Sequence, residues 1–325
     1  MGSRTRFFFR VRSMQPRCRR IANMKREQAK GPKPFLKWVG GKTQLLPELE
    51  ARLPNDFTKT VRVYAEPFVG GGALLFHLRS KGFRPERIAI NDSNPDLANA
   101  YRVVQRNPDG LVESLKRFES DYQGLPDQTA KRSFYTGVRC SYNAGRSFDR
   151  SEDVARAAEL IFLNKTCFNG LYRVNSKGLF NVPFGKHAKP TICDEPAIRA
   201  ASAALVGAEI LCADFAEVVN HADSGWFVYF DPPYRPISAT SAFCDYTQGG
   251  FGDEEQRRLA DVCKALDASG ARWLLSNSDP PDGFFNELYR GFRIDHVQAT
   301  RAINSKGDGR GQISEIIVSN GKECG

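Results

Sequence analysis

Short apolar runs recur along the chain, and segments whose apolar residues have helical spacing lie between them. The runs predict strands over residues 62–66, 87–91, 208–212, 226–230, 272–276, 292–297 and 313–318. Helices are predicted over residues 73–80 and 95–105, each after one of the first two strands. This alternation of strands and helices is typical of an α/β fold with a doubly wound, mostly parallel sheet.

The second and third predicted strands are far apart in the sequence. Residues 109–163 have a helical pattern without strand signals, and residues 164–193 mix Asn, Gly, Pro and aromatic residues irregularly. We therefore predict a smaller, helical subdomain over residues 109–199, inserted into a main domain formed by residues 34–108 and 200–322. A chain of 325 residues is long enough to bury the core that this arrangement needs.

The formal net charge of +10 comes from the amino-terminal segment. Residues 1–33 contain eleven Lys and Arg residues and one acid, whereas the rest of the chain contains 36 basic and 36 acidic side chains. We expect this basic extension to be disordered, or to precede a true start at Met14 or Met24. An organellar transit peptide is a weaker alternative, and Arg10 and Arg12 interrupt the apolar residues too early for a signal peptide.

Four residues, Asp231-Pro232-Pro233-Tyr234, directly follow the apolar run of residues 226–230. In open α/β sheets, ligands bind at the carboxyl ends of the strands. The Asp231 carboxylate and the Pro232 carbonyl could accept the two protons of an exocyclic base amine, which localises its lone pair. The prolines fix this backbone, and Tyr234 offers a flat face for a base taken out of the helix. A proline-stiffened turn without catalytic function is the alternative.

A glycine-rich turn over residues 66–72 follows the first predicted strand and opens a helix. Its glycines, including Gly70 and Gly72, let the backbone approach a ligand at a helix amino terminus. A dinucleotide fingerprint would need glycine at Leu75, which disfavours a nicotinamide dehydrogenase. A cofactor with an adenosine but no pyrophosphate fits better, and Asp92, at the end of the second strand, is placed to bind its ribose hydroxyls.

Two further segments bear on the cofactor. Asp214 and Phe215 follow the third strand, where the carboxylate could bind an adenine amino group and the phenyl ring could stack on the base. Upstream, Gly41-Lys42-Thr43 matches the end of a phosphate-binding loop, but the earlier glycine of that loop would fall at Leu36. A nucleotide triphosphatase is therefore a weak alternative.

The irregular segment is strongly basic. No acidic residue lies between Glu159 and Asp194, whereas five basic residues do: Lys165, Arg173, Lys177, Lys186 and Lys189. Such a window, interleaved with aromatic residues, is a candidate surface for nucleic-acid phosphates. A surface loop with solvated charges is the alternative.

The eight cysteines indicate neither disulfides nor a metal site. No two of them are closer than 19 residues, and the four histidines form no metal-ligating pair. We expect no metal and a reduced, cytoplasmic setting. No stretch approaches the length of a membrane span.

These motifs, in this order, resemble the Dam-type DNA adenine N6-methyltransferases, and the resemblance covers most of residues 34–320. Three segments are similar to the family's first cofactor motif, glycine loop and catalytic motif: residues 35–42, 66–72 and 231–234. Residues 169–175 and 180–185 resemble the DNA-recognition segment of members specific for GATC. The resemblance implies methyl transfer from S-adenosyl-L-methionine to adenine N6 of double-stranded DNA.

Together, the motifs and the resemblance assign three sets of residues. The expected catalytic residues are Asp231, Pro232 and Tyr234. Cofactor contacts are expected from Trp38, Lys42, Phe68, Gly70, Gly72, Asp92, Asp214, Phe215 and Asp231. DNA contacts are expected from Lys37, Phe168, Asn169, Leu171, Arg173, Asn175 and Pro183. Within this last set, the family pattern has Phe168 wedged into the duplex while Lys37, Arg173 and Pro183 read bases.

Several alternatives stay open. Family members are expected to vary at five interior positions of the recognition segment: Tyr172, Val174, Ser176, Lys177 and Leu179. A related target containing GAT is therefore an alternative to GATC. Cytosine N4, an RNA amine, or a catalytically silent DNA-binding module on the same fold are further alternatives. We expect a monomer, either solitary or paired with a cognate restriction enzyme.

Two loops near the motifs each allow two interpretations. Residues 235–252 are rich in Ser, Thr and Gly, which favours either a mobile lid or an ordinary surface loop. Residues 301–310 form a basic, Gly-rich hairpin tip that either reaches phosphates or is a solvated turn.

Overall fold

The computed structural model describes residues 31–38, 40–145, 153–235, 251–300 and 312–321. Three expectations concern residues outside these ranges. They are the basic extension, apart from its last three residues, most of the loop over residues 235–252, and the hairpin tip over residues 301–310.

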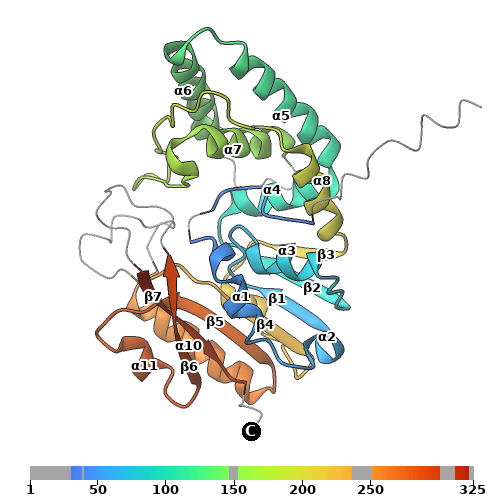
Figure 1. Ribbon diagram of the computed structural model, residues 1–325, viewed down its shortest axis with the longest axis vertical. Helices are drawn as coiled ribbons and strands as arrows, with labels where there is room; N and C mark the ends of the chain where they lie inside the picture. The colour runs from blue at the N-terminus through green and yellow to red at the C-terminus, as the bar shows by residue number, and fades with distance from the viewer. Residues whose placement is uncertain (1–30, 39, 146–152, 236–250, 301–311, 322–325) are drawn as a thin grey trace, which may run out of the picture. The chain divides into compact units, whose positions relative to one another are not determined.

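Seven strands form one sheet in the order β3-β2-β1-β4-β5-β7-β6 (Figure 1). Their bounds are β1 Val63–Glu66, β2 Arg87–Asn91, β3 Ala208–Leu211, β4 Trp226–Phe230, β5 Arg272–Ser278, β6 Arg293–Thr300 and β7 Gln312–Ser319. Strands β1 to β5 pair in parallel, and β7 runs antiparallel to both β5 and β6. The predicted mostly parallel α/β fold is therefore confirmed. Strands β5 and β6 extend beyond their predicted ends because their pairing with β7 continues there.

The helices follow the strands, as predicted, and also fill the insertion between β2 and β3. Their bounds are α1 Leu46–Glu50, α2 Phe57–Thr60, α3 Ala73–Ser80, α4 Pro95–Arg106, α5 Pro108–Gln123, α6 Gln128–Ala144, α7 Val154–Thr166, α8 Glu195–Ala204, α9 Phe215–Val218, α10 Asp253–Ala268 and α11 Phe284–Leu288. Two short 3-10 helices span Lys42–Gln44 and Phe168–Gly170. The Asn94 side chain caps α4 by accepting hydrogen bonds from two backbone N–H groups, which is the usual device that starts a helix after a strand.

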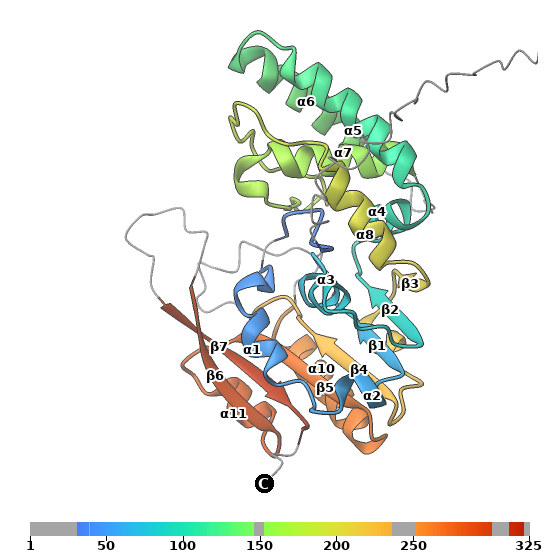
Figure 2. The ribbon, with the colours of Figure 1, turned by 45° about the vertical axis from the view of Figure 1, so that its right-hand side comes forward.

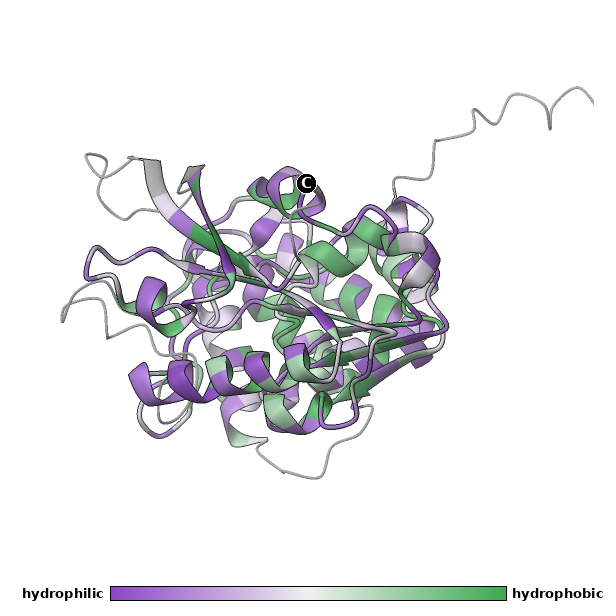
Figure 3. Ribbon diagram, turned by 90° about the horizontal axis from the view of Figure 1, so that it is seen from below, coloured by the Kyte–Doolittle hydropathy of each residue, from purple (hydrophilic) through white to green (hydrophobic). Residues whose placement is uncertain are grey.

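Side chains alternate across each strand, so the sheet has two buried faces. On β4, Phe227 and Tyr229 belong to one apolar cluster, which also contains residues of α1, α3 and α4. Val228 and Phe230 belong to a second cluster, which contains residues of α9, α10 and α11. The strands therefore form an apolar layer between two layers of helices (Figures 1 and 3).

Helices α5, α6 and α7 of the insertion lie beside one another (Figure 2). Aromatic rings from the three helices are in contact. The Phe162 ring lies 4.9 Å from the Phe118 ring and 5.5 Å from the Phe134 ring, between centroids. The first apolar cluster continues from the sheet through α4 into these helices. A separate subdomain over residues 109–199 stays a prediction.

A buried ion pair fastens the insertion to α4. The Arg156 guanidinium donates two hydrogen bonds of 2.8 Å to the Asp96 carboxylate, and the Tyr142 hydroxyl donates one of 2.6 Å to it. The guanidinium also lies 3.5 Å above the centre of the Tyr142 ring. Asp96 is in the first turn of α4, a few positions after Asp92 in the sequence. This cluster therefore ties α6 and α7 to the segment that carries Asp92, a candidate cofactor residue.

Arg156→Ala should lower the free energy of unfolding by about 3–5 kcal/mol, because it leaves a mostly buried carboxylate without its partner. Urea unfolding followed by circular dichroism would measure the change. Arg199→Ala, which removes an exposed ion pair with Asp109, is the matched control and should leave the midpoint unchanged within error. Equal midpoints for the two variants would contradict the anchoring role of Arg156.

Candidate active site

The carboxyl ends of β1, β2 and β4 meet at one edge of the sheet, as expected for neighbouring parallel strands. The Asn91 side chain joins this edge together. Its amide nitrogen donates to the Pro67 carbonyl at 2.9 Å and to the Ala213 carbonyl at 3.1 Å, and its oxygen accepts from Ala213 N–H at 2.8 Å. The glycine turn, Asp92 and the Asp231 tetrapeptide therefore lie at the same edge of the sheet.

The centre of the site is an ion pair between Lys42 and Asp231. The Lys42 Nζ lies 2.8 Å from Asp231 Oδ1, and Lys42 is only 4% exposed. Ser276 Oγ donates a further hydrogen bond of 3.3 Å to the same carboxylate. Burial raises the pKa of the Asp231 carboxyl above its usual value, and the charge of Lys42 opposes that rise. The predicted catalytic carboxylate is thus mostly buried, with 23% of its side chain exposed, and is held by one buried cation.

Tyr234 is fixed at its hydroxyl end. The hydroxyl accepts a hydrogen bond from Lys42 Nζ and donates one to the Glu315 carboxylate. The ammonium also lies 4.1 Å from the centre of the Tyr234 ring. Next to it, Pro232 is buried, and Gln256 donates a hydrogen bond of 3.1 Å to the Pro233 carbonyl. The tetrapeptide is therefore held rigidly on both sides of its prolines.

Two partners in this network, Ser276 and Glu315, were not predicted from the sequence. Ser276 lies in β5, which pairs with β4, and Glu315 lies in β7, which pairs with the other edge of β5. Neither residue belongs to a motif. A prediction of the antiparallel β5–β7 pairing would have been the only route to Glu315.

The glycine turn after β1 requires its glycines. Gly70 and Gly72 have φ values of 47° and 68°, which side chains rarely adopt. A Cβ on Gly72 would lie 2.7 Å from the Tyr101 hydroxyl, and one on Gly70 would lie 2.9 Å from Cδ1 of Trp38. The Tyr101 hydroxyl also donates a hydrogen bond of 3.0 Å to the Gly70 carbonyl. The turn is therefore a preformed cradle with a backbone free of side chains.

Asp92 closes this cradle from β2. Its carboxylate accepts hydrogen bonds from the backbone N–H groups of Gly70, at 3.2 Å, and Asn94, at 2.9 Å. Burial raises the pKa of Asp92 to about 6, although the two hydrogen bonds oppose the rise. Asp92 lies directly after β2, where the sequence predicted it, and its contact with ribose hydroxyls stays a prediction.

A second acid, Glu66, lies beneath the glycine turn and is 1% exposed. The Tyr64 hydroxyl donates a hydrogen bond of 2.5 Å to it. Burial raises the pKa of Glu66 to about 8, and the nearby charge of Asp231 adds to the rise. Glu66 is the first residue of the glycine motif, and the sequence predicted no role for it. In the structure it is a hydrogen-bonding group at the end of β1 that is largely uncharged near neutral pH.

Phe68 and Phe215 form an aromatic wall beside the turn. Their ring centroids are 5.2 Å apart, and the Phe251 ring lies 5.5 Å from Phe68. Asp214 is the N-cap of α9, where it accepts from Ala216 N–H at 2.9 Å and also pairs with Arg258. One oxygen of Asp214 is therefore occupied within the protein. Phe68 is half-buried, whereas Phe215 is only 5% exposed, so Phe68 is the more accessible of the two rings.

The recognition segment presents its predicted residues unevenly. Phe168 is 44% exposed, an unusual state for a large apolar side chain, and Asn169 and Pro183 are exposed near it. Arg173 is exposed too, with its Nε donating a hydrogen bond of 2.8 Å to the Asn181 side chain. These four side chains are accessible to a large ligand.

Two other predicted DNA contacts have roles inside the segment. The Asn175 side-chain oxygen accepts hydrogen bonds of 3.0 Å from the N–H groups of Lys177 and Leu179, so it shapes the tip of the loop. Leu171 is half-buried, and its carbonyl accepts a hydrogen bond from the Cys167 thiol. These contacts leave Asn175 exposed but give it a structural function as well.

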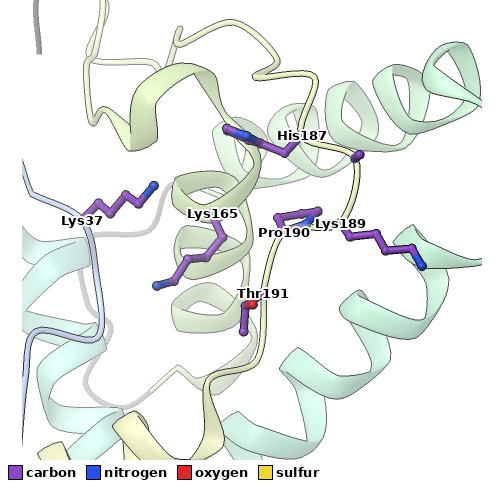
Figure 4. Close-up of a pocket in the computed structure, with 7 residues that line it drawn as sticks. Lys37, Lys165, His187, Lys189, Pro190 and Thr191 are labelled. Atoms are coloured by element: carbon purple, nitrogen blue, oxygen red, sulfur yellow. The ribbon is translucent and has the colours of Figure 1, made fainter.

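Lys37 joins the first cofactor motif to the recognition segment. Its backbone N–H and carbonyl pair with the Asn164 side chain at 3.0 Å and 2.8 Å, and its side chain crosses so close to Gly170 that a Cβ there would lie 2.5 Å away. Together with Lys165 and His187, Lys37 lines a pocket of about 410 Å³ (Figure 4). This basic hollow continues the predicted nucleic-acid surface.

Trp38 connects the same two regions through its ring. The indole stacks on the Tyr172 ring at 5.2 Å between centroids, with 23° between the planes, and its other neighbour is the Gly70 backbone. Trp38 is half-buried there and was predicted as a cofactor contact. Tyr172 was predicted only as a variable position.

Within the described residues, no group of three or more His, Cys, Asp or Glu side chains is arranged to hold a metal ion. The same part of the chain contains no helix with the length and apolar character that a membrane crossing needs.

Known proteins resemble this chain over most of its length. The chain matches the model of the D12 class N6 adenine-specific DNA methyltransferases over residues 38–303. Type II methyltransferase M.MjaIII of Methanocaldococcus jannaschii is 46% identical over 290 residues, which are 89% of this chain and 99% of the relative. Type II methyltransferase M1.LlaDCHI of Lactococcus lactis subsp. cremoris is 42% identical over 290 residues, with coverage of 89% and 95%.

A DNA adenine methylase of Escherichia coli (strain K12) is 32% identical over 288 residues, which are 87% of this chain and 94% of the relative. The family match extends over the insertion and over strands β1 to β6. The chain therefore belongs to the D12 class of N6 adenine-specific DNA methyltransferases, enzymes that act on DNA with a methyl donor.

Proposed function

We propose that the protein transfers the methyl group of S-adenosyl-L-methionine directly to adenine N6 in duplex DNA, at GATC or a related site that contains GAT. The observation that carries this proposal is the mostly buried Asp231 carboxylate beside Tyr234, at the same sheet edge as the glycine cradle. A flipped adenine stacked on Tyr234 would bring its amine to this carboxylate.

The cradle fits the donor. Gly70 and Gly72 keep the backbone free of side chains, Asp92 offers a ribose acceptor, and Phe68 and Phe215 offer a stacking wall. Bound there, S-adenosyl-L-methionine supplies an electrophilic methyl group on a positively charged sulfur. The remaining chemistry belongs to the chain's own residues, which position the base and accept its protons.

Asp231 and the Pro232 carbonyl are the proposed acceptors for the two N6 protons. Hydrogen bonds to both acceptors favour a tetrahedral nitrogen with a localised lone pair. Lys42 keeps the Asp231 carboxylate oriented at 2.8 Å, and Tyr234 cannot rotate freely because its hydroxyl is held at both Lys42 and Glu315. The acceptors are therefore in place before the base arrives.

Target recognition is proposed to come from the exposed residues of the insertion. Phe168 would fill the gap that base flipping leaves in the stack, and Arg173 would read guanine in the major groove. Lys37 and Pro183 would complete the contacts to bases, while Asn169, Leu171 and Asn175 hold or extend the segment. Because two of the relatives are named Type II methyltransferases, a cognate restriction enzyme is part of the proposal.

The test is transfer of labelled methyl groups to two duplexes that differ only in GATC or GTTC, with the product nucleosides identified. We expect N6-methyladenine in the GATC duplex alone. Asp231→Asn, which keeps the shape of the side chain, should bind the duplex with the wild-type affinity but transfer methyl groups at least about 100-fold more slowly. Equal labelling of both duplexes would reject the target, and normal turnover by Asp231→Asn would reject the proton acceptor.

The affinity for S-adenosyl-L-methionine should depend on the protonation of Asp92. Its pKa of about 6 lies above the usual value, so the carboxylate that binds ribose is ionised above pH 6 and is lost as the pH falls through 6. We expect a constant dissociation constant above about pH 7 and a rise of about tenfold per pH unit well below 6. Calorimetric titration at several pH values would measure it.

Asp92→Asn is the control for this effect, since it should bind more weakly at neutral pH and show a flat profile over the same range. A wild-type affinity that stays constant down to pH 5, or a variant that keeps the wild-type slope, would show that Asp92 does not hold the ribose.

A further inference from the structure

Two hydrogen-bonded routes lead away from the Asp231 carboxylate. The first passes to Ser276, at 3.3 Å, and from there to the Tyr229 hydroxyl, at 2.9 Å. Ser276 is 0% exposed and Tyr229 is 2% exposed, so this route ends inside the protein. Burial also raises the pKa of the Tyr229 hydroxyl well above its usual value, so the hydroxyl stays protonated at the closed end of this route.

The second route passes from Asp231 to Lys42 Nζ, at 2.8 Å, then to the Tyr234 hydroxyl and on to the Glu315 carboxylate. Glu315 lies on β7 and is half-buried, in contrast to the closed end of the first route. Among the described residues, the chain of contacts thus begins at the proposed proton acceptor and ends at a carboxylate that solvent can reach.

Adenine methylation needs an exit of this kind. When N6 forms its bond to the methyl carbon, the carbon–sulfur bond breaks, and the nitrogen carries an additional positive charge until it loses one proton. In the proposed reaction that proton passes to Asp231, which is 23% exposed in the free protein and would be covered by a base stacked on Tyr234. Until Asp231 loses it again, the carboxylate and its ion pair with Lys42 are not restored.

We propose that Glu315 receives this proton through Lys42 and Tyr234. Protonated Asp231 gives a proton to Lys42 Nζ as Lys42 gives one to the Tyr234 oxygen and Tyr234 gives its own to Glu315. Asp231 returns to a carboxylate, Lys42 to an ammonium and Tyr234 to a phenol, while Glu315 becomes neutral and then releases the proton to water. The assignment rests on the proposed role of Asp231 in adenine N6 methylation.

The state of Tyr234 agrees with a relay. Burial, with the nearby carboxylates of Asp231 and Glu315, raises the pKa of its hydroxyl well above the usual value. It therefore does not ionise on its own, and a proton crosses it only when one is accepted as another is donated. Its two partners occupy the positions that such a transfer needs: a donor at the oxygen and an acceptor at the hydrogen.

The experiment follows proton release and methyl transfer together in the first turnover. Enzyme is mixed with S-adenosyl-L-methionine and a GATC duplex in weakly buffered solution with a pH indicator, and samples quenched in parallel are assayed for N6-methyladenine. In the wild type we expect one proton in solution at the rate of methyl transfer. In Glu315→Gln the proton should appear at least about tenfold later than the methyl group, when the product dissociates.

Tyr234→Phe keeps the aromatic ring but removes the relaying hydroxyl, so it should show the same delay in proton release. A variant with both Tyr234→Phe and Glu315→Gln should show no additional delay. Glu315→Asp, which restores a carboxylate, should recover part of the synchrony. Asp279→Asn is the matched control: it removes a carboxylate that contacts Ser314 and His296 near the same strand, and should release its proton as the wild type does.

Synchronous release in Glu315→Gln would overturn the relay. If Glu315→Gln forms no N6-methyladenine at all, methylation by Glu315→Asp supports the proposal. If neither variant forms N6-methyladenine, Glu315 has a structural role and the relay is overturned. A wild-type enzyme that forms no N6-methyladenine would instead refute the proposed function, and the relay with it. Binding of S-adenosyl-L-methionine with the wild-type affinity shows that each variant is folded.

Discussion

The ion pair between Lys42 and Asp231 is the interaction on which the site depends. Removing both groups from water costs several kcal/mol for each ion, and only close pairing with further hydrogen bonds offsets that cost. Here Lys42 donates to Asp231, to the Gly40 carbonyl and to Tyr234, so each of its three N–H groups has an acceptor. The pair thereby fixes the segment before the sheet against the end of the central strand β4.

The same pair explains how motifs that are far apart in the sequence come together at one place. A buried carboxylate at the end of β4 needs a cation, and the chain supplies it from the segment that also carries Trp38 and Lys37. Trp38 of that segment touches the glycine cradle at Gly70 and stacks on Tyr172 of the recognition segment. Lys37 lies against Gly170 and pairs with Asn164. Catalytic, cofactor and DNA-facing residues are therefore neighbours of one short stretch.

The fold and most of the site could be predicted because local patterns specify them. Short apolar runs such as residues 226–230 are typical of buried strands, and the motifs follow directly at their ends. Glycine at positions 70 and 72 is required by the backbone alone, which is a local property. Ser276, Glu315 and Tyr101 could not be found in this way, because their contacts with Asp231, Tyr234 and Gly70 join elements that only the folded arrangement brings together.

The missed residues share a physical reason. Strand alternation says that Glu315 and Ile316 face opposite sides of β7, but not which strand lies beside them. The sheet order puts β7 between β5 and β6, opposite to the order in which β6 and β7 occur in the chain. That single exchange brings a carboxylate from the end of the sequence to the Tyr234 hydroxyl. A polar side chain there would read as an ordinary strand residue, and only the antiparallel pairing makes it part of the catalytic network.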